Sequence, residues 1–205
     1  MKLIRKGAEA DLYLSSFEEL YFPWNQEKIL IKKRISKGYR NPDLDQELRV
    51  RRTLHEARLL HEAKIAVNTP ILYEVNKNEC IIVMEYIEGM RAKEWLTEDI
   101  ALQIGRSIAL LHQKGIVHGD ITTSNIIIKE GHIYFIDFGL GEFSTEVEPQ
   151  AVDLHLLKQT LKSTHHETWQ SLWKGILEGY KERENAEEVI SRIEDIEKRG
   201  RYVKR

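Results

Sequence analysis

Two short stretches in the second half of the chain place acidic and amide side chains beside apolar runs. In VHGDITTSN, residues 117–125, Asp120 and Asn125 stand five positions apart and immediately before three isoleucines. A second acid, Asp137, begins the tripeptide DFG directly after another apolar run. Burying polar groups beside strands costs free energy unless something binds them. A carboxylate and an amide that hold a divalent cation and a phosphate group would account for the pattern.

The first half of the chain supplies a cation and a further acid. Lys32 lies in the strand-like stretch KILIKK, and Glu56 lies within the helix-like stretch LHEARLL. Phosphoryl transfer needs a cation on the α/β phosphates, an acid that orients it, metal ligands, and a carboxylate near the acceptor hydroxyl. Singly, Lys32 and Glu56 are more often solvated residues, but the four elements follow the chain order of the kinase signature. We therefore predict catalytic roles for Lys32, Glu56 and Asp120, with Asn125 and Asp137 as metal ligands.

The elements that must position these residues change in character along the chain. The first half is rich in strands, predicted at residues 1–4, 12–17, 28–33, 71–75 and 80–84, the last two forming an antiparallel pair across the turn NKNE. Apolar residues at three- and four-residue steps predict one helix over residues 43–64, starting after Pro42.

The second half is predicted to be mainly helical. A helix is expected over residues 98–113 and ends at Gly115. Strands follow at 126–129 and 132–136, and the chain after Gln150 is expected to be helical to about Arg199. The change predicts an α+β protein of two lobes, about 1–87 and 88–197, that form a single domain joined near MEYIEG, with any cleft between the lobes.

Composition limits the protein class. The chain has 205 residues, 41% of them hydrophobic, and a formal net charge of −2, which excludes a wholly basic nucleic-acid binder. Cys80 is the single cysteine, so no internal disulfide is possible. No signal peptide and no membrane-length apolar run stand out, so we expect a soluble cytoplasmic protein without a membrane partner.

The ordered motifs resemble those of a very small protein kinase, over nearly the whole chain. That resemblance implies ATP and Mg²⁺ as cofactors. It identifies VMEYIEG, residues 83–89, as the hinge that holds adenine through the carbonyl of Glu85 and the amide of Ile87, with Met84 as gatekeeper. It also makes KGAEADLY the phosphate flap, whose ATP-binding residues would be Lys6, Gly7, Ala8 and Glu9.

Two segments carry a more specific resemblance. IKKRISKGYRNPDLDQELRVRRTLHEARLL and the terminal KRGRYVKR are similar to the Bud-thirty-two/PRPK family, the atypical small Ser/Thr kinase or ATPase subunit of the KEOPS (EKC) complex. That complex makes threonylcarbamoyladenosine on tRNA. The resemblance implies a Kae-type threonylcarbamoyl transferase subunit and the other KEOPS subunits as partners.

The chain departs from most kinases at several positions. The flap has one glycine where most kinases have three, and its Glu9 would repel phosphates, which predicts restraint of turnover. Leu30 stands where the kinase strand motif VAIK has alanine, and its larger side chain would narrow the adenine-binding pocket. Gly119 replaces the arginine that grips a phosphorylated activation loop, and no APE follows. These departures argue against control of activity by phosphorylation of the activation loop. They also leave little surface on which a peptide substrate could bind.

Alternative functions follow from the same residues. HGD with a downstream asparagine also occurs in aminoglycoside- and choline-kinase-like enzymes, although those usually carry larger helical additions. A Rio-type kinase is a closer relative, although such a kinase would normally carry extra N-terminal helices that we do not find in this sequence. A non-catalytic scaffold would be indicated by loss of Lys32, Asp120 or Asp137, and all three are present.

Basic residues concentrate in two places. The stretch KKRISKGYR, residues 32–40, is either a solvated loop or a contact for phosphate backbones. The last eight residues hold five cations and no acid, which predicts a tail that contacts tRNA and reaches back toward the cleft. The cations of the tail are Lys198, Arg199, Arg201, Lys204 and Arg205.

Overall fold

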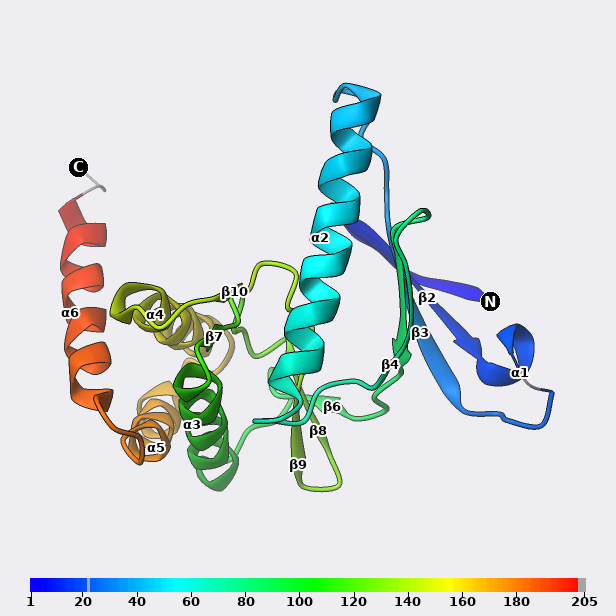
Figure 1. Ribbon diagram of the computed structural model, residues 1–205. Coiled ribbons are helices and arrows are strands. Elements are labelled where there is room, and N and C mark those ends of the chain that lie inside the picture. The colour runs from blue at the N-terminus through cyan, green and yellow to red at the C-terminus, as the bar shows by residue number, and fades with distance from the viewer. Residues whose placement is uncertain (22, 203–205) are drawn as a thin grey trace. The chain divides into compact units, whose positions relative to one another are not determined.

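The computed structural model describes residues 1–21 and 23–202, with the side chains of 1–21 and 23–199 (Figure 1). The chain divides into two compact units. The first consists of Met1–His61 and Pro70–Glu88, and the second of Glu62–Thr69 and the chain from Gly89 onward. The segment 62–69, assigned to the first lobe from the sequence, therefore belongs to the second unit.

The first unit contains an antiparallel sheet in the order β1-β2-β3-β5-β4. The predicted pair of strands across the turn NKNE is confirmed as β4 and β5. A short helix, α1, was not predicted. The bounds are β1 Lys2–Lys6, β2 Ala10–Ser16, α1 Phe17–Leu20, β3 Lys28–Arg34, β4 Leu72–Asn76 and β5 Ile81–Glu85.

Alternation along β3 gives the sheet two different faces. Ile29 and Ile31 are buried in one apolar cluster, which Phe17 and Tyr73 help to cover. Lys32 and Arg34 have the opposite parity and direct their cationic ends to helix α2 (Pro42–Ala63). A single strand thus contributes to a core and presents two charges to the helix.

Helix α2 begins at Pro42, one residue before the predicted start. The Asn41 side chain accepts hydrogen bonds from the amides of Asp43 (3.0 Å) and Leu44 (3.3 Å). Pro42 lies in the first turn, where its missing N–H leaves no bond unmade. The helix ends at Ala63, one residue before the predicted end.

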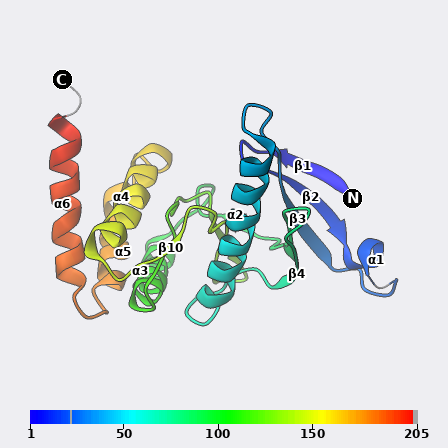
Figure 2. The ribbon, with the colours of Figure 1, turned by 45° about the horizontal axis from the view of Figure 1, so that its top comes forward.

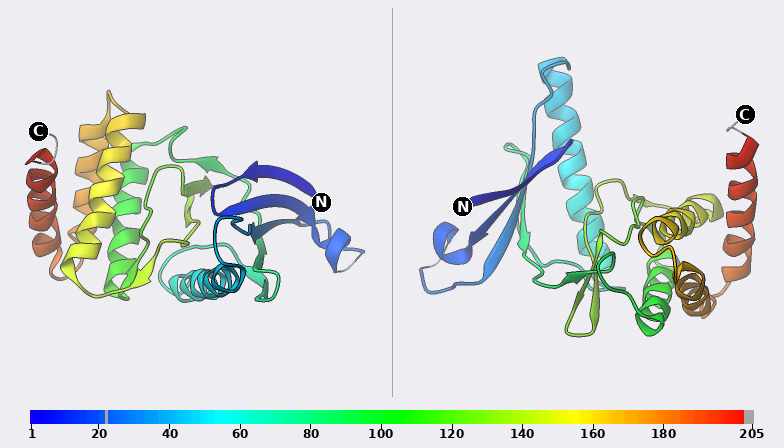
Figure 3. Two further views of the ribbon diagram at one scale, coloured as in Figure 1. Left: turned by 90° about the horizontal axis from the view of Figure 1, so that it is seen from above. Right: turned by 180° about the vertical axis from the view of Figure 1, so that it is seen from behind.

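The second unit is built on helices that lie side by side (Figures 2 and 3). Helix α3 matches its prediction, and Gly115 follows it with φ +67°. The single helical region expected after Gln150 is instead interrupted twice. The bounds are α3 Glu98–Gln113, α4 Val147–Thr164, α5 Trp169–Tyr180 and α6 Ala186–Tyr202. Within the described residues, no helix is long and apolar enough to cross a membrane.

Helices α3 and α5 approach each other through glycines. A β-carbon on Gly105 would lie 2.0 Å from the carbonyl oxygen of Ile176, and one on Gly179 would lie 2.1 Å from that of Leu102. Only glycine permits such backbone contact. This packing fixes α3 as the support for the loop that follows it.

Short strands complete the second unit and frame its polar loops. The predicted hairpin is present, with Ile126 opposite Phe135. Strand β6 adds to it, and β7 pairs with β10; these three strands of two residues each were not predicted. The bounds are β6 Met90–Arg91, β7 Ile116–Val117, β8 Ile126–Lys129, β9 His132–Phe135 and β10 Glu142–Phe143.

Candidate active site

Asp120 and Asn125 lie in direct contact in the loop between β7 and β8. The Asn125 Nδ2 donates to the Asp120 main-chain oxygen (3.0 Å) and to its Oδ2 (2.8 Å). Because the amide nitrogen is bound to Asp120, the amide oxygen is the side-chain atom through which Asn125 could bind a metal ion. The five-residue spacing thus closes a small loop that holds a carboxylate and an amide together.

His118 fixes this loop to the segment that directly precedes Asp137. The His118 ring is fully buried, and burial lowers its pKa, so the imidazole is neutral. Its Nε2 lies 3.2 Å from the Ile136 carbonyl, which assigns the proton to Nε2. Its Nδ1 then accepts a hydrogen bond from the Asp120 amide (3.3 Å). One neutral ring therefore joins the backbones of the two motifs.

A residue that the sequence analysis missed, Asp153 on α4, holds the same loop from the other side. Its carboxylate is buried and accepts hydrogen bonds from the amides of His118 (2.7 Å) and Gly119 (2.8 Å). The buried ring of His112 lies 3.3 Å from the same carboxylate and 2.9 Å from the hydroxyl of Tyr180. No spacing rule connects Asp153 with Asp120, because the two meet only through the fold.

Gly119 has two structural reasons to be glycine. Its φ is +79°, in the left-handed region that side chains rarely adopt. A β-carbon would also lie 2.1 Å from the Leu140 carbonyl oxygen. The arginine found here in most kinases would therefore require a different loop conformation.

Strand pairing brings Asp137 next to Asn125. The amide of Ile136 donates to the Asn125 carbonyl (3.0 Å), continuing the register of the β8–β9 hairpin. Asp137 follows with φ +66°, and its Oδ1 accepts a hydrogen bond from the Gly139 amide (3.3 Å). The two predicted metal ligands thus come from adjacent chain segments.

The acids of this unit influence one another. Burial raises the pKa of Asp120, the hydrogen bond from Asn125 opposes that shift, and the negative charges of Asp137 and Asp153 add to it.

Among the described residues no group of three or more His, Cys, Asp or Glu forms a metal cage. An amide and an exposed carboxylate instead suit Mg²⁺, which usually takes few protein ligands and completes its shell with phosphates and water.

In the first unit, Lys32 and Glu56 form the predicted ion pair. The Lys32 Nζ lies 2.6 Å from Glu56 Oε1, and both side chains are largely buried. A third residue, Arg34, was not predicted as part of the site. Its Nη2 lies 2.6 Å from Glu56 Oε2, and its side chain is 5% exposed. The period of two along a strand, applied to Lys32, would have indicated Arg34.

The predicted adenine-binding residues are at the end of β5. Met84, the predicted gatekeeper, is buried and pairs across the sheet with Leu30. The Glu85 amide donates to the Ile71 carbonyl (2.8 Å), and Ile87 is buried. The hinge role of Glu85 and Ile87 remains a prediction.

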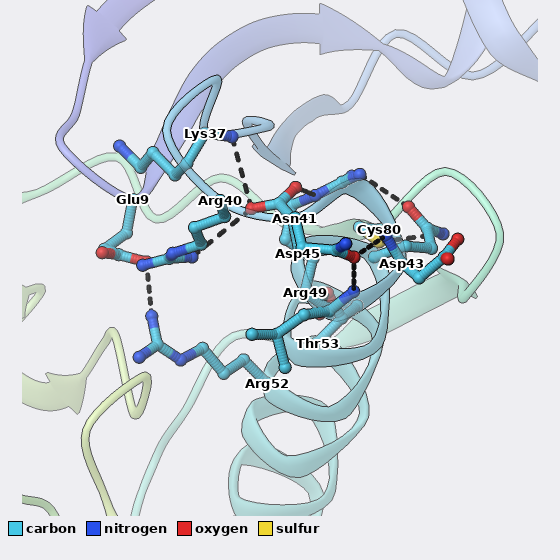
Figure 4. A network of polar contacts seen from close by, with 12 residues as sticks. Glu9, Lys37, Arg40, Asn41, Asp43, Asp45, Arg49, Arg52, Thr53 and Cys80 are labelled. Atoms are coloured by element: carbon cyan, nitrogen blue, oxygen red, sulfur yellow. Dashed lines mark hydrogen bonds and ion pairs between the residues drawn. The ribbon is translucent and has the colours of Figure 1, made fainter.

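The segment predicted to be the phosphate flap contains the turn between β1 and β2, and several contacts attach this turn to the rest of the first unit (Figure 4). Glu9 Oε2 lies 2.5 Å from Arg52 Nη1 of α2, and the Glu9 carbonyl accepts from the Ile35 amide (3.3 Å). The Lys37 ammonium donates to the Ala8 carbonyl. The predicted ATP-binding flap residues are the exposed Lys6, Ala8 and Glu9 and the half-buried Gly7. The Glu9 carboxylate has a cationic partner, which the repulsion argument did not anticipate.

The basic stretch 32–40 is not a continuous solvated run. Arg40 Nη1 (3.4 Å) and Arg49 Nε (2.7 Å) bind the buried carboxylate of Asp45, as Figure 4 shows. The Lys37 amide also donates to Asp45 (3.3 Å). The hydrogen bond from Arg49 is the main reason that the pKa of Asp45 is lowered. Part of the stretch is therefore structural.

The predicted basic tail begins on helix α6. Arg199 donates to both oxygens of Glu148 (3.0 and 3.3 Å), and Lys198 lies 3.6 Å from Asp195. Two of the five tail cations are thus paired within the second unit. The side chains of the other three, Arg201, Lys204 and Arg205, lie outside the described residues.

Comparison with known proteins identifies the family. The protein kinase domain family matches residues 23–168. The KEOPS complex subunit Bud32 of Pyrococcus abyssi is 48% identical, and the alignment covers 100% of this chain and 98% of that protein. The chain belongs to the Bud32 family. The Bud32 family resemblance, the kinase-like fold and the class of ATP-dependent kinase or ATPase predicted from the sequence are therefore confirmed.

Other relatives place the Bud32 family in context. A probable serine/threonine-protein kinase BUD32 homolog of Archaeoglobus fulgidus is 45% identical over 87% of this chain and 91% of its own length. A probable bifunctional tRNA threonylcarbamoyladenosine biosynthesis protein of Methanothermobacter thermautotrophicus is 44% identical, and the chain spans 36% of it. Among solved structures, Rio2 kinase of Chaetomium thermophilum, in an ADP/Mg²⁺-phosphoaspartate complex, matches 98% of the chain with a TM-score of 0.65 and 13% identity, which shows a shared fold.

Proposed function

We propose that this chain is an ATP- and Mg²⁺-dependent Ser/Thr kinase or ATP hydrolase that works as a subunit of a KEOPS complex in threonylcarbamoyladenosine modification of tRNA. The observation that carries the catalytic part is the Asp120–Asn125 contact, held by His118 and Asp153. The assembly part is supported by full-length similarity to a named KEOPS subunit. A cytoplasmic location fits both parts.

Each predicted residue would have its own part in the chemistry. Asp120 would accept the proton of the attacking hydroxyl or orient a water molecule. Asn125 and Asp137 would hold Mg²⁺, which neutralises charge on the phosphates when bound. Lys32 would bind the α/β phosphates, and Glu56 would orient Lys32.

The partners follow from the same comparisons. We infer that a Kae-type threonylcarbamoyl transferase and other KEOPS subunits bind this chain, because relatives of the bifunctional type carry the Bud32-like region within a longer biosynthetic protein. We also infer that the basic tail contacts tRNA. Phosphate contacts would make that binding strongly dependent on salt.

One experiment tests the function and separates its two outputs. Purified protein is incubated with γ-labelled ATP, with and without the transferase subunit and tRNA. Released phosphate reports hydrolysis, and label on protein reports kinase activity. We expect Asp120→Asn to lose whichever output is found. Turnover that is equal in wild type and Asp120→Asn would contradict the proposed role of Asp120, and no turnover under any condition would favour a scaffold.

A further inference from the structure

The buried carboxylate of Glu56 is shared by two cations of one strand. Lys32 and Arg34 are two residues apart on β3, so their side chains lie on the same face. They bind different oxygens of Glu56, each at 2.6 Å. Lys33, between them, is exposed. The kinase signature requires the lysine and the glutamate but makes no demand for a second cation here.

Arg34 is itself held in place by both its backbone and its side chain. Its amide donates to the Cys80 carbonyl (3.0 Å) on the neighbouring segment of the sheet. Its Nη2 also lies 3.4 Å from the Arg52 carbonyl, one helical turn before Glu56. The guanidinium therefore contacts the backbone of α2 and the side chain that α2 presents. A planar guanidinium loses less freedom per hydrogen bond than an ammonium, which suits it to this role.

We propose that Arg34 is a positioning residue that holds Glu56, and through it Lys32, in the phosphate-binding arrangement before any nucleotide binds. In protein kinases the formation of this lysine–glutamate pair is controlled by the position of the helix and by phosphorylation of the activation loop. Here Gly119 occupies the place of the arginine that receives a loop phosphate. A second cation on Glu56 gives α2 a permanent anchor in place of that switch. The proposal rests on the proposed ATP-dependent function.

Three variants separate position from charge. Arg34→Met removes the charge at similar length, Arg34→Lys keeps it, and Lys33→Met is the matched control on the exposed side of the same strand. We expect Arg34→Met to raise the KM for Mg-ATP about tenfold with a smaller change in kcat. Arg34→Lys should recover part of the loss, and Lys33→Met should stay within about twofold of wild type. An unchanged KM in folded Arg34→Met would overturn the proposal.

A double variant tests whether Arg34 acts through Glu56. If it does, Glu56→Ala and Glu56→Ala/Arg34→Met should have the same affinity for Mg-ATP, because Glu56→Ala already removes the group that Arg34 binds. Additive losses would mean that Arg34 works by another route. Near-ultraviolet circular dichroism at the assay temperature checks that each variant is folded.

Hydrogen exchange tests the proposal in the wild-type protein, where folding is not in question. Amides of residues 52–60 in α2 should be equally protected with and without Mg-ADP, and in Arg34→Met they should gain protection only when Mg-ADP is added. A large gain in wild type would show that the nucleotide assembles the pair. Wild type that binds no nucleotide would instead count against the proposed function itself.

Discussion

Asp120 is held where its charge is unfavourable, as expected of a residue kept for chemistry. Burial and the charges of Asp137 and Asp153 raise its pKa above the ordinary value of 3.8. A raised folded-state pKa means that stability is present at low pH and is lost as pH rises through that pKa. The carboxylate therefore destabilises the fold at neutral pH, a cost that the proposed catalytic role of Asp120 would explain.

Asp120→Asn should consequently raise the melting temperature at neutral pH. The amide keeps an oxygen for the bond from Asn125 and removes the repulsion between acids. The gain should disappear at pH below about 3.8, where the wild-type acid is protonated in both the folded and unfolded states. Thermal scans between pH 3 and 7 measure this. A melting temperature lowered equally at all pH values would refute the argument.

Gly119→Ala should destabilise the fold and stop turnover. The left-handed φ alone costs about 1–2 kcal/mol for an alanine, and the Leu140 carbonyl adds a steric clash. Gly131→Ala is the matched control, because Gly131 has φ +78° but no atom within 4 Å of the new β-carbon. Denaturant titration should show a larger loss for Gly119→Ala than for Gly131→Ala. Equal losses would mean that the clash is relieved at no cost.

At the scale of elements, long periodic segments were predictable and short paired ones were not. Helix α3 and strands β8 and β9 follow from local pattern, whereas β6, β7 and β10 exist only because distant chain segments pair with them. The site shows the same division. The motif residues were found from spacing. Asp153 was missed because only the tertiary structure brings it to the motifs, whereas Arg34 could have been found from the two-residue period of the strand that carries Lys32.

The phosphate flap illustrates how the structure changes an expectation. We predict that Glu9→Ala binds Mg-ATP at least as tightly as wild type. The variant would lose the negative charge that repels phosphates, and it would also release the Arg52 cation from its exposed ion pair with Glu9. Loss of that ion pair should cost at most about 1 kcal/mol of folding stability. Titration with Mg-ATP compares Glu9→Ala with Arg52→Ala. A marked loss of affinity in Glu9→Ala would indicate that Glu9 helps to bind a metal.

The whole molecule should be sensitive to mild acid through buried histidines. Burial lowers the pKa of His112 and His118 from 6.5, so both stay neutral when folded but protonate when unfolded. Their contribution is full above pH 6.5 and is lost as pH falls through the lower folded-state values. The melting temperature should therefore fall between pH 6.5 and 5. His118→Asn should reduce that slope, and an unchanged slope would remove His118 from this explanation.

The most direct test of the account is to separate nucleotide binding from turnover in two single variants. Asp120→Asn should bind Mg-ATP within about threefold of wild type but lose turnover by about a hundredfold or more, because its role is in the chemical step. Asp137→Asn should instead weaken nucleotide binding, and only when Mg²⁺ is present. Binding and turnover are measured for both variants on the same preparations. Wild-type turnover by Asp120→Asn, or magnesium-dependent affinity unchanged in Asp137→Asn, would contradict the assignment of the site.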